Sequence, residues 1–172
     1  MSNGQTFIVD AYNVIHQSPP MRACLRRSKE TARDSLIAFC IEWRSRRRDA
    51  DAFWVVFDGD PTISAASSAR AIPRHVHVVY AASGEKADGR ILEMLDASPA
   101  PGRCVVVTAD RRVAEGATLR GAHVWTPAQF LGLLRSPPRT AAGDFSGDNK
   151  NGLSGREQKQ INDEMKRVFG VE

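Results

Sequence analysis

Residues 53–58 read Phe-Trp-Val-Val-Phe-Asp, an unbroken apolar run that ends in an aspartate. Two further runs have the same form: residues 7–10 read Phe-Ile-Val-Asp, and residues 104–110 read Cys-Val-Val-Val-Thr-Ala-Asp. A continuous apolar run suits a strand that is covered on both faces of a parallel sheet. If the three runs are neighbouring parallel strands, their aspartates meet at one edge of the sheet, where open α/β folds bind their ligands.

The segments between these runs carry helical and strand patterns in alternation. Apolar residues recur at three- and four-residue steps over residues 28–47, which predicts an amphipathic helix with Arg33 on its polar side. Residues 10–27 contain Ser-Pro-Pro and are expected to be a loop. The other expected elements are strands over 75–80 and 122–125 and helices over 86–96, 110–119 and 127–135. This alternation predicts an α/β fold, a three-layer sandwich with a mostly parallel central sheet of about five strands.

The composition of the chain changes near its end. Residues 1–138 form the expected globular domain, and residues 139–153 are rich in Gly, Asp, Asn and Ser, which predicts a flexible linker. In residues 154–172, Ser154 and Glu157 form a capping box ahead of one apolar helical face. We expect this C-terminal amphipathic helix to dock on the domain, to form a homodimer, or to contact a partner.

Charge and cysteine content limit the class of protein. The chain has 24 Lys and Arg against 20 Asp and Glu, a mildly basic balance that permits nucleic-acid binding without requiring it. Its three cysteines lie far apart, with no CxxC pair, which favours a reducing compartment. The start of the chain is polar, and no apolar run is long enough to span a membrane. We therefore expect a soluble, cytoplasmic protein.

A fourth carboxylate joins the three at the strand ends. Asp88 lies three and four residues before Ile91 and Leu92, so it extends their apolar stripe toward the start of the expected helix. A buried carboxylate must be paired, protonated or bound to a metal. The expected metal ligands are Asp10, Asp58, Asp88 and Asp110. Ligation by oxygen alone indicates Mg²⁺ or Mn²⁺, and such ions suit phosphodiester hydrolysis.

Other polar residues lie beside these aspartates. Asn13, three residues after Asp10, can fix that carboxylate or a water by hydrogen bonding. Glu85 either shares the face of Asp88 or helps the helix to begin. Tyr12 either stacks on a base or lies in the core.

Grouped arginines are the expected contacts to a nucleic-acid backbone. Arg111 and Arg112 directly follow Asp110, and Arg26 belongs to a group with Arg22 and Arg27. Such contacts contribute affinity without sequence choice. Alternatively, Arg22, Arg26 and Arg27 form the solvent-exposed face of a helix and do not contact nucleic acid.

Four motifs, taken in order, resemble the YacP-like NYN domains of the PIN-like nuclease superfamily. They are Val-Asp-Ala-Tyr-Asn-Val-Ile-His at 9–16, Val-Phe-Asp at 56–58, Gly-Glu-Lys-Ala-Asp at 84–88 and Thr-Ala-Asp at 108–110. The resemblance spans about residues 6–135. It implies a Rossmann-like, PIN-like sheet and a metal-dependent endoribonuclease in which the four aspartates hold Mg²⁺ or Mn²⁺. It also implies RNA as the partner, with messenger RNA cleaved in association with ribosomes in some related proteins.

One position departs from the family pattern. The last motif commonly has Ser or Asn where this chain has Ala109, so Thr108 is left to orient Asp110. Two other functions stay open: a catalytically inactive RNA- or ribosome-binding module of the same fold, and a metal-dependent phosphatase. The four aspartates argue against the module. The phosphatase lacks support because Asp10-Ala11-Tyr12 has no second aspartate of a D-x-D nucleophile motif.

Overall fold

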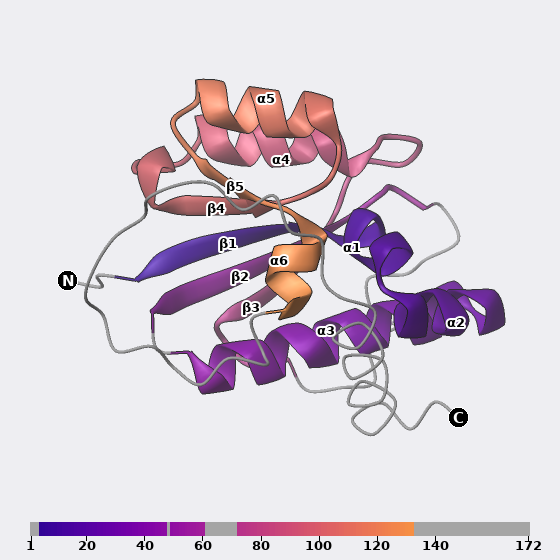
Figure 1. Ribbon diagram of the computed structural model, residues 1–172. Coiled ribbons are helices and arrows are strands. Elements are labelled where there is room, and N and C mark those ends of the chain that lie inside the picture. Colours follow the sequence, from indigo (N-terminus) through magenta and orange to yellow (C-terminus); the bar gives the residue numbers. More distant parts are fainter. Residues whose placement is uncertain (1–3, 48, 61–71, 133–172) are drawn as a thin grey trace.

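A computed structural model describes residues 4–47, 49–60 and 72–132. Within these residues the centre of the protein is a five-stranded sheet of order β3-β2-β1-β4-β5, in which every neighbouring pair is parallel (Figure 1). The strands are β1 (Gln5–Asp10), β2 (Ala50–Phe57), β3 (Val76–Tyr80), β4 (Cys104–Val107) and β5 (His123–Trp125). The predicted α/β class is confirmed, and the described sheet is wholly parallel.

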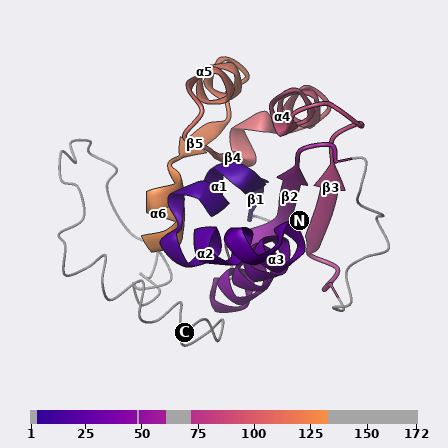
Figure 2. The same cartoon turned by 90° about the vertical axis from the view of Figure 1, so that its right-hand side faces the viewer.

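Helices cover both faces of the sheet and complete the three layers (Figures 1 and 2). One face carries α1 (Ala11–Gln17), α2 (Pro19–Arg27), α3 (Lys29–Arg46) and α6 (Pro127–Gly132). The other carries α4 (Ala87–Asp96) and α5 (Arg111–Leu119). A short 3₁₀ helix, η1 (Pro101–Arg103), leads into β4.

The apolar runs are unbroken because each strand buries side chains on both faces. Along β1, Phe7 and Val9 point to one face and Ile8 to the other. The ring centroid of Phe7 lies 4.8 Å from that of Trp43 in α3 and 5.0 Å from that of Phe53 in β2. On the opposite face, Ile8 belongs to a cluster with apolar residues of α4 and α5: Ile91, Leu95, Val113 and Ala117.

The expectation of a loop over residues 10–27 is wrong. The chain forms α1 directly after Asp10 and then α2, with a break at Ser18. Pro19 is the first residue of α2, a position where the missing N–H is not needed and the fixed φ suits a helix. The Ser-Pro-Pro stretch therefore separates two helices and starts the second, so the predicted break in the helix is confirmed but the predicted loop is not.

The assignment of Arg33 to the polar side of its helix is also wrong. Only 6% of this residue is exposed, because the N-terminal half of α3 packs against the ends of β2 and β3. The predicted domain boundary at 138, the linker and the C-terminal helix lie outside the described residues. In the part of the chain that is described, no helix is long and apolar enough to cross a membrane.

Candidate active site

The strand order gathers the predicted aspartates at the carboxyl edge of the sheet. Asp10 ends β1, which lies between β2 and β4 in the sheet. Asp58 directly follows β2, and Asp110 follows β4 by three residues. Asp88 lies in the first turn of α4, the helix that begins after β3. Asp10 is therefore the central carboxylate of this edge.

Asp10 is buried, with 6% of its surface exposed. The pKa of its carboxyl group is raised to about 6, chiefly by burial and further by the negative charges of Asp88 and Asp58. The hydroxyl of Thr108, which donates to Asp10 Oδ2 at 2.9 Å, and the backbone N–H of Asn13 act in the opposite direction. Asp10, Asp58 and Asp88 thus share one electrostatic environment, in which negative charge accumulates.

Asp58 is tied to the start of α4. Its Oδ1 accepts a hydrogen bond from the backbone N–H of Ala87 at 2.8 Å. The bond gives a partner to one of the N–H groups that a helix leaves unpaired at its N-terminus. Because Asp88 is the next residue of the helix and is half-buried, the contact also brings the first turn of α4 to the end of β2.

Asp110 caps its own helix. Its Oδ1 accepts hydrogen bonds from the backbone N–H groups of Arg112 at 2.8 Å and Val113 at 3.2 Å, at the start of α5. Its backbone N–H donates to Thr108 Oγ1 at 3.0 Å. Within residues 4–47, 49–60 and 72–132, no three acidic, His or Cys side chains are grouped closely enough to hold one ion. A metal site formed by all four aspartates remains a prediction.

Asn13 connects two of the turns at this edge. Its side-chain Oδ1 accepts a hydrogen bond from the backbone N–H of Ala109 at 2.7 Å, so it joins the start of α1 to the β4–α5 turn. Ala109, which departs from the family pattern, thus contributes to the site through its backbone N–H. The hydroxyl of Thr108 joins both aspartates: it donates its proton to Asp10, and its oxygen accepts the backbone N–H of Asp110.

Glu85 and Gly59 belong to a contact between the two neighbouring loops. Glu85 is exposed, and its carbonyl oxygen accepts the N–H of Gly59 at 2.8 Å. A Cβ atom on Gly59 would collide with the backbone carbonyl of Ala82. Glycine at position 59 therefore permits the β3–α4 loop to approach the residue after Asp58. Gly59 is not among the residues predicted for the site, although a glycine directly after a strand-end aspartate is a usable signal.

The predicted substrate-binding residues lie around the edge. Tyr12 is half-buried, and its ring contacts the Phe57 ring at 5.7 Å between centroids, which favours the core alternative for this residue. Arg111 and Arg112 are exposed at the start of α5, where Arg111 Nε pairs with Glu115 at 2.8 Å.

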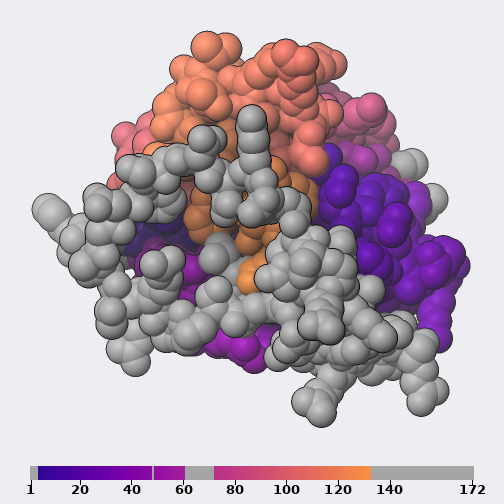
Figure 3. Space-filling model, in the orientation of Figure 1, coloured from indigo at the N-terminus to yellow at the C-terminus, as the bar shows by residue number. Residues whose placement is uncertain are grey.

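Arg26 is exposed on α2, as are its neighbours Arg22 and Arg27. The helices α1 and α2 form one continuous surface of the molecule (Figure 3). Since α1 begins directly after Asp10, α1 and α2 lie on the side of the molecule where the strands end (Figure 1).

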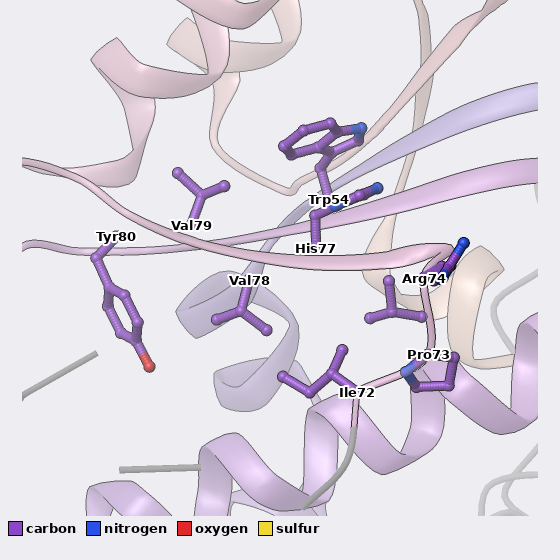
Figure 4. Close-up of a pocket in the computed structure, with 9 residues that line it drawn as sticks. Trp54, Ile72, Pro73, Arg74, His77, Val78, Val79 and Tyr80 are labelled. Carbon is purple, nitrogen blue, oxygen red and sulfur yellow. The ribbon is translucent and has the colours of Figure 1, made fainter. Parts of the chain in front are cut away.

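A separate hollow borders the edge strand β3. Trp54 and His77 stack there with ring centroids 4.1 Å apart, and Arg74 and Tyr80 lie at its rim (Figure 4). None of the residues predicted for the site lines this hollow.

The fold and the edge define a Rossmann-like α/β domain with an acidic centre at the carboxyl ends of its strands. The family model described as the YacP-like NYN domain matches residues 7–170, and the chain belongs to this family, a PIN-like nuclease family. The resemblance found in the motifs is confirmed.

Two solved structures of Rae1 (YacP) from Bacillus subtilis are similar to this chain. A point mutant is 24% identical with a TM-score of 0.60, and the match covers 95% of this chain and 80% of that chain. A second structure is 22% identical with a TM-score of 0.57, covering 94% and 78% respectively. These likenesses show the fold. No curated protein matches the chain.

Proposed function

We propose that this protein is a metal-dependent endoribonuclease that hydrolyses RNA phosphodiester bonds at the carboxyl edge of its sheet. The observation that supports this most directly is the buried Asp10, whose pKa is raised to about 6 by burial and by the charges of Asp88 and Asp58. A fold tolerates carboxylates gathered in this way most easily when a cation offsets their charge. Membership of a nuclease family gives this cation a chemical role.

The fit to a hard divalent cation rests on the chemistry of the side chains, because the described carboxylates are not grouped closely enough to hold one ion as they stand. The candidate ligands are carboxylates, which are the ligands that Mg²⁺ and Mn²⁺ prefer. Asp10, Asp58 and Asp88 would hold the ion, and Asp110 would join them through the oxygen that does not cap α5. When bound, such an ion activates a water and offsets charge on the phosphate.

The surrounding residues would position the carboxylates and the substrate. Thr108 holds Asp10, and Asn13 fixes the turn that carries Asp110. Arg112 is exposed beside Asp110 and would contact the RNA backbone, and Arg26 with its neighbours on α2 would extend this contact. Contacts of this kind bind RNA without reading its sequence.

RNA is the proposed partner. Messenger RNA and the ribosome are the setting that the family resemblance implies, and the cytoplasm is the corresponding location. The expected C-terminal helix over residues 154–172 would supply a homodimer or partner contact. Cys24, Cys40 and Cys104 are free thiols, which agrees with a reducing compartment.

The proposal is tested by incubating labelled single-stranded RNA with the protein and either Mn²⁺ or EDTA. We expect cleavage with Mn²⁺ only, and at least a hundredfold loss in Asp10→Asn. Asp110→Asn should lose activity to a similar extent if its free oxygen ligates the ion. Asp96→Asn is the matched control, because Asp96 ends α4 away from the edge and pairs with Arg120. Cleavage that survives EDTA and both active-site substitutions would contradict the metal-dependent mechanism.

A second candidate function is an inactive RNA- or ribosome-binding module. It is favoured by the side chain of Asp110, which is engaged in capping α5. Binding of RNA without cleavage in Mn²⁺ or Mg²⁺ would support the module. Release of phosphate from a small phosphomonoester, without cleavage of RNA, would support a phosphatase instead.

A further inference from the structure

A buried arginine lies at the same edge of the sheet. Arg33 of α3 is 6% exposed, and its Nε donates to Tyr12 Oη at 3.2 Å. Its guanidinium carbon lies 5.8 Å from the ring centroid of Phe57 and 5.9 Å from that of Tyr80. Figure 4 shows Tyr80 on the same side of β3 as Val78 and opposite Val79, so its ring faces the layer that contains α3.

This guanidinium is adjacent to the acidic centre along the chain and across the sheet. Phe57 directly precedes Asp58, and Tyr12 follows Asp10 by two residues. The residues that contact Arg33 are thus close in the chain to two aspartates of the acidic edge, with the arginine on the β2–β3 side.

Arg33 hydrogen-bonds the hydroxyl groups of Tyr12 and Tyr80, but its nearest carboxylate is distant. The Oδ2 atom of Asp60 lies 4.0 Å from a terminal nitrogen of Arg33, at the outer limit of an ion pair. The same oxygen lies 2.9 Å from Nζ of Lys29, which draws the carboxylate away from the guanidinium. Burying a charge is costly unless it is paired and hydrogen-bonded. The Arg33 side chain retains 7% exposure.

We propose that Arg33 binds a phosphodiester group of the RNA strand, next to the phosphate that lies at the acidic edge. The planar fork of a guanidinium matches two phosphate oxygens, and Tyr12 and the ring of Tyr80 hold its plane in place. The anionic phosphate would supply the partner that Asp60 supplies only at long range. This inference rests on the proposed function, because it takes RNA as the substrate.

The test measures RNA binding in EDTA, where metal-dependent cleavage does not occur. Affinity for a labelled single-stranded RNA is followed by fluorescence anisotropy over a range of salt concentrations, for wild type, Arg33→Met, Arg33→Lys and the control Arg120→Met. Arg120 lies at the end of α5, where it pairs with Asp96. We expect Arg33→Met to reduce the slope of log K against log salt by about 0.7, the value for one phosphate contact on a single strand.

Arg33→Lys separates this role from a structural one. Lysine keeps the charge but not the fork, so we expect the salt slope of wild type with affinity reduced by about three- to tenfold. Arg120→Met should keep both slope and affinity. Wild-type affinity in the lysine variant, or an unchanged slope in a folded methionine variant, would overturn the inference, as would absence of RNA binding by wild type. RNA binding that depends on Arg33, without cleavage in Mn²⁺, would uphold the contact and reject only the nuclease function.

Discussion

The hydroxyl of Thr108 donates a hydrogen bond of 2.9 Å to Oδ2 of Asp10 and links two neighbouring strands at their carboxyl ends. Both residues are buried, with 2% of Thr108 and 6% of Asp10 exposed. The bond favours the ionised carboxylate and so limits the rise in the pKa of Asp10 that burial causes. Thr108 therefore helps to keep a buried acid available as an anion.

Replacing Thr108 by valine should weaken both the fold and the charge on Asp10. Valine has a similar shape but no hydroxyl, so a buried carboxylate oxygen loses its donor, at a cost of about 1–3 kcal/mol. The pKa of Asp10 should rise further. Urea unfolding measures the first effect and NMR titration the second. Thr108→Ser should stay near wild type, and Thr118→Val is the control for the same change at an exposed site. Equal stability of the two valine variants would contradict the role of Thr108.

Asp10 should make the metal-free protein less stable as the pH rises. Its folded pKa of about 6 exceeds the ordinary value of 3.8, so between these values the folded state binds more protons than the unfolded state. The stability due to Asp10 is therefore present below pH 3.8 and is lost as the pH rises through 6. The shift corresponds to a loss of about 3 kcal/mol as an upper limit.

The measurement compares urea unfolding of wild type and Asp10→Asn in EDTA between pH 4 and 7. The difference in unfolding free energy between them should change by up to about 3 kcal/mol, with wild type losing more stability as the pH rises. Asp96→Asn is the control, because the hydrogen bond from Arg120 lowers the pKa of Asp96 and its effect on stability is lost only at pH values below this range, so its profile should run nearly parallel to that of wild type. A wild type and an Asp10→Asn variant with parallel pH profiles would show that Asp10 is not buried as described.

Gly59→Ala should separate the two loops that hold Asp58 against α4. The new Cβ would collide with the backbone carbonyl of Ala82, and backbone cannot yield as a flexible side chain can. We expect a loss of about 1–3 kcal/mol in urea unfolding, as for other overpacked sites. Gly89→Ala is the control: it lies within α4 with no atom within 4 Å of its Cβ, so it should gain about 0.5–1 kcal/mol. A neutral Gly59→Ala would mean that the loops are not in contact.

The strands could be predicted because their burial on both faces of the sheet leaves a visible pattern of apolar residues in the sequence. Strands such as β2 are covered on both faces and leave an unbroken apolar run, which also marks where Asp58 follows. The two helices over residues 11–27 are not predicted, because the Ser-Pro-Pro stretch between them is typical of a loop. Proline inside a helix breaks it, whereas proline at the first position does not, because the N–H group that it lacks has no partner there. Pro19 occupies that first position in α2.

The parts that were missed depend on contacts between distant elements. Helical periodicity places Arg33 on a polar face, yet the ends of β2 and β3 cover that face and bury the guanidinium. Nothing local to residue 33 distinguishes it from an exposed arginine. The opposite holds for Asp110: its position was predicted, but its capping of α5 follows from the turn geometry after β4. The spacing of residues in the sequence therefore predicts where Asp110 lies in the fold, but it does not predict which groups its carboxylate oxygens bind.

The arginines of α2 should contribute to RNA affinity through charge alone. Arg22, Arg26 and Arg27 are exposed, and among the described residues the ion pairs do not include them. If all three contact phosphates, replacing them by glutamine should reduce the slope of log K against log salt by about 2 for single-stranded RNA. The loss should be the same for RNAs of different sequence, since backbone contacts carry no base information.

The matched control for this triple substitution changes three arginines that pair with acidic residues away from the carboxyl edge: Arg46, Arg103 and Arg120. This variant loses the same net charge, so it measures the effect of overall charge on RNA binding. If the two triple variants show the same salt slope, affinity follows net charge and α2 is a solvated helix face. If only the α2 variant loses slope, the RNA strand crosses α2, because a phosphate contact releases counterions only where the strand lies.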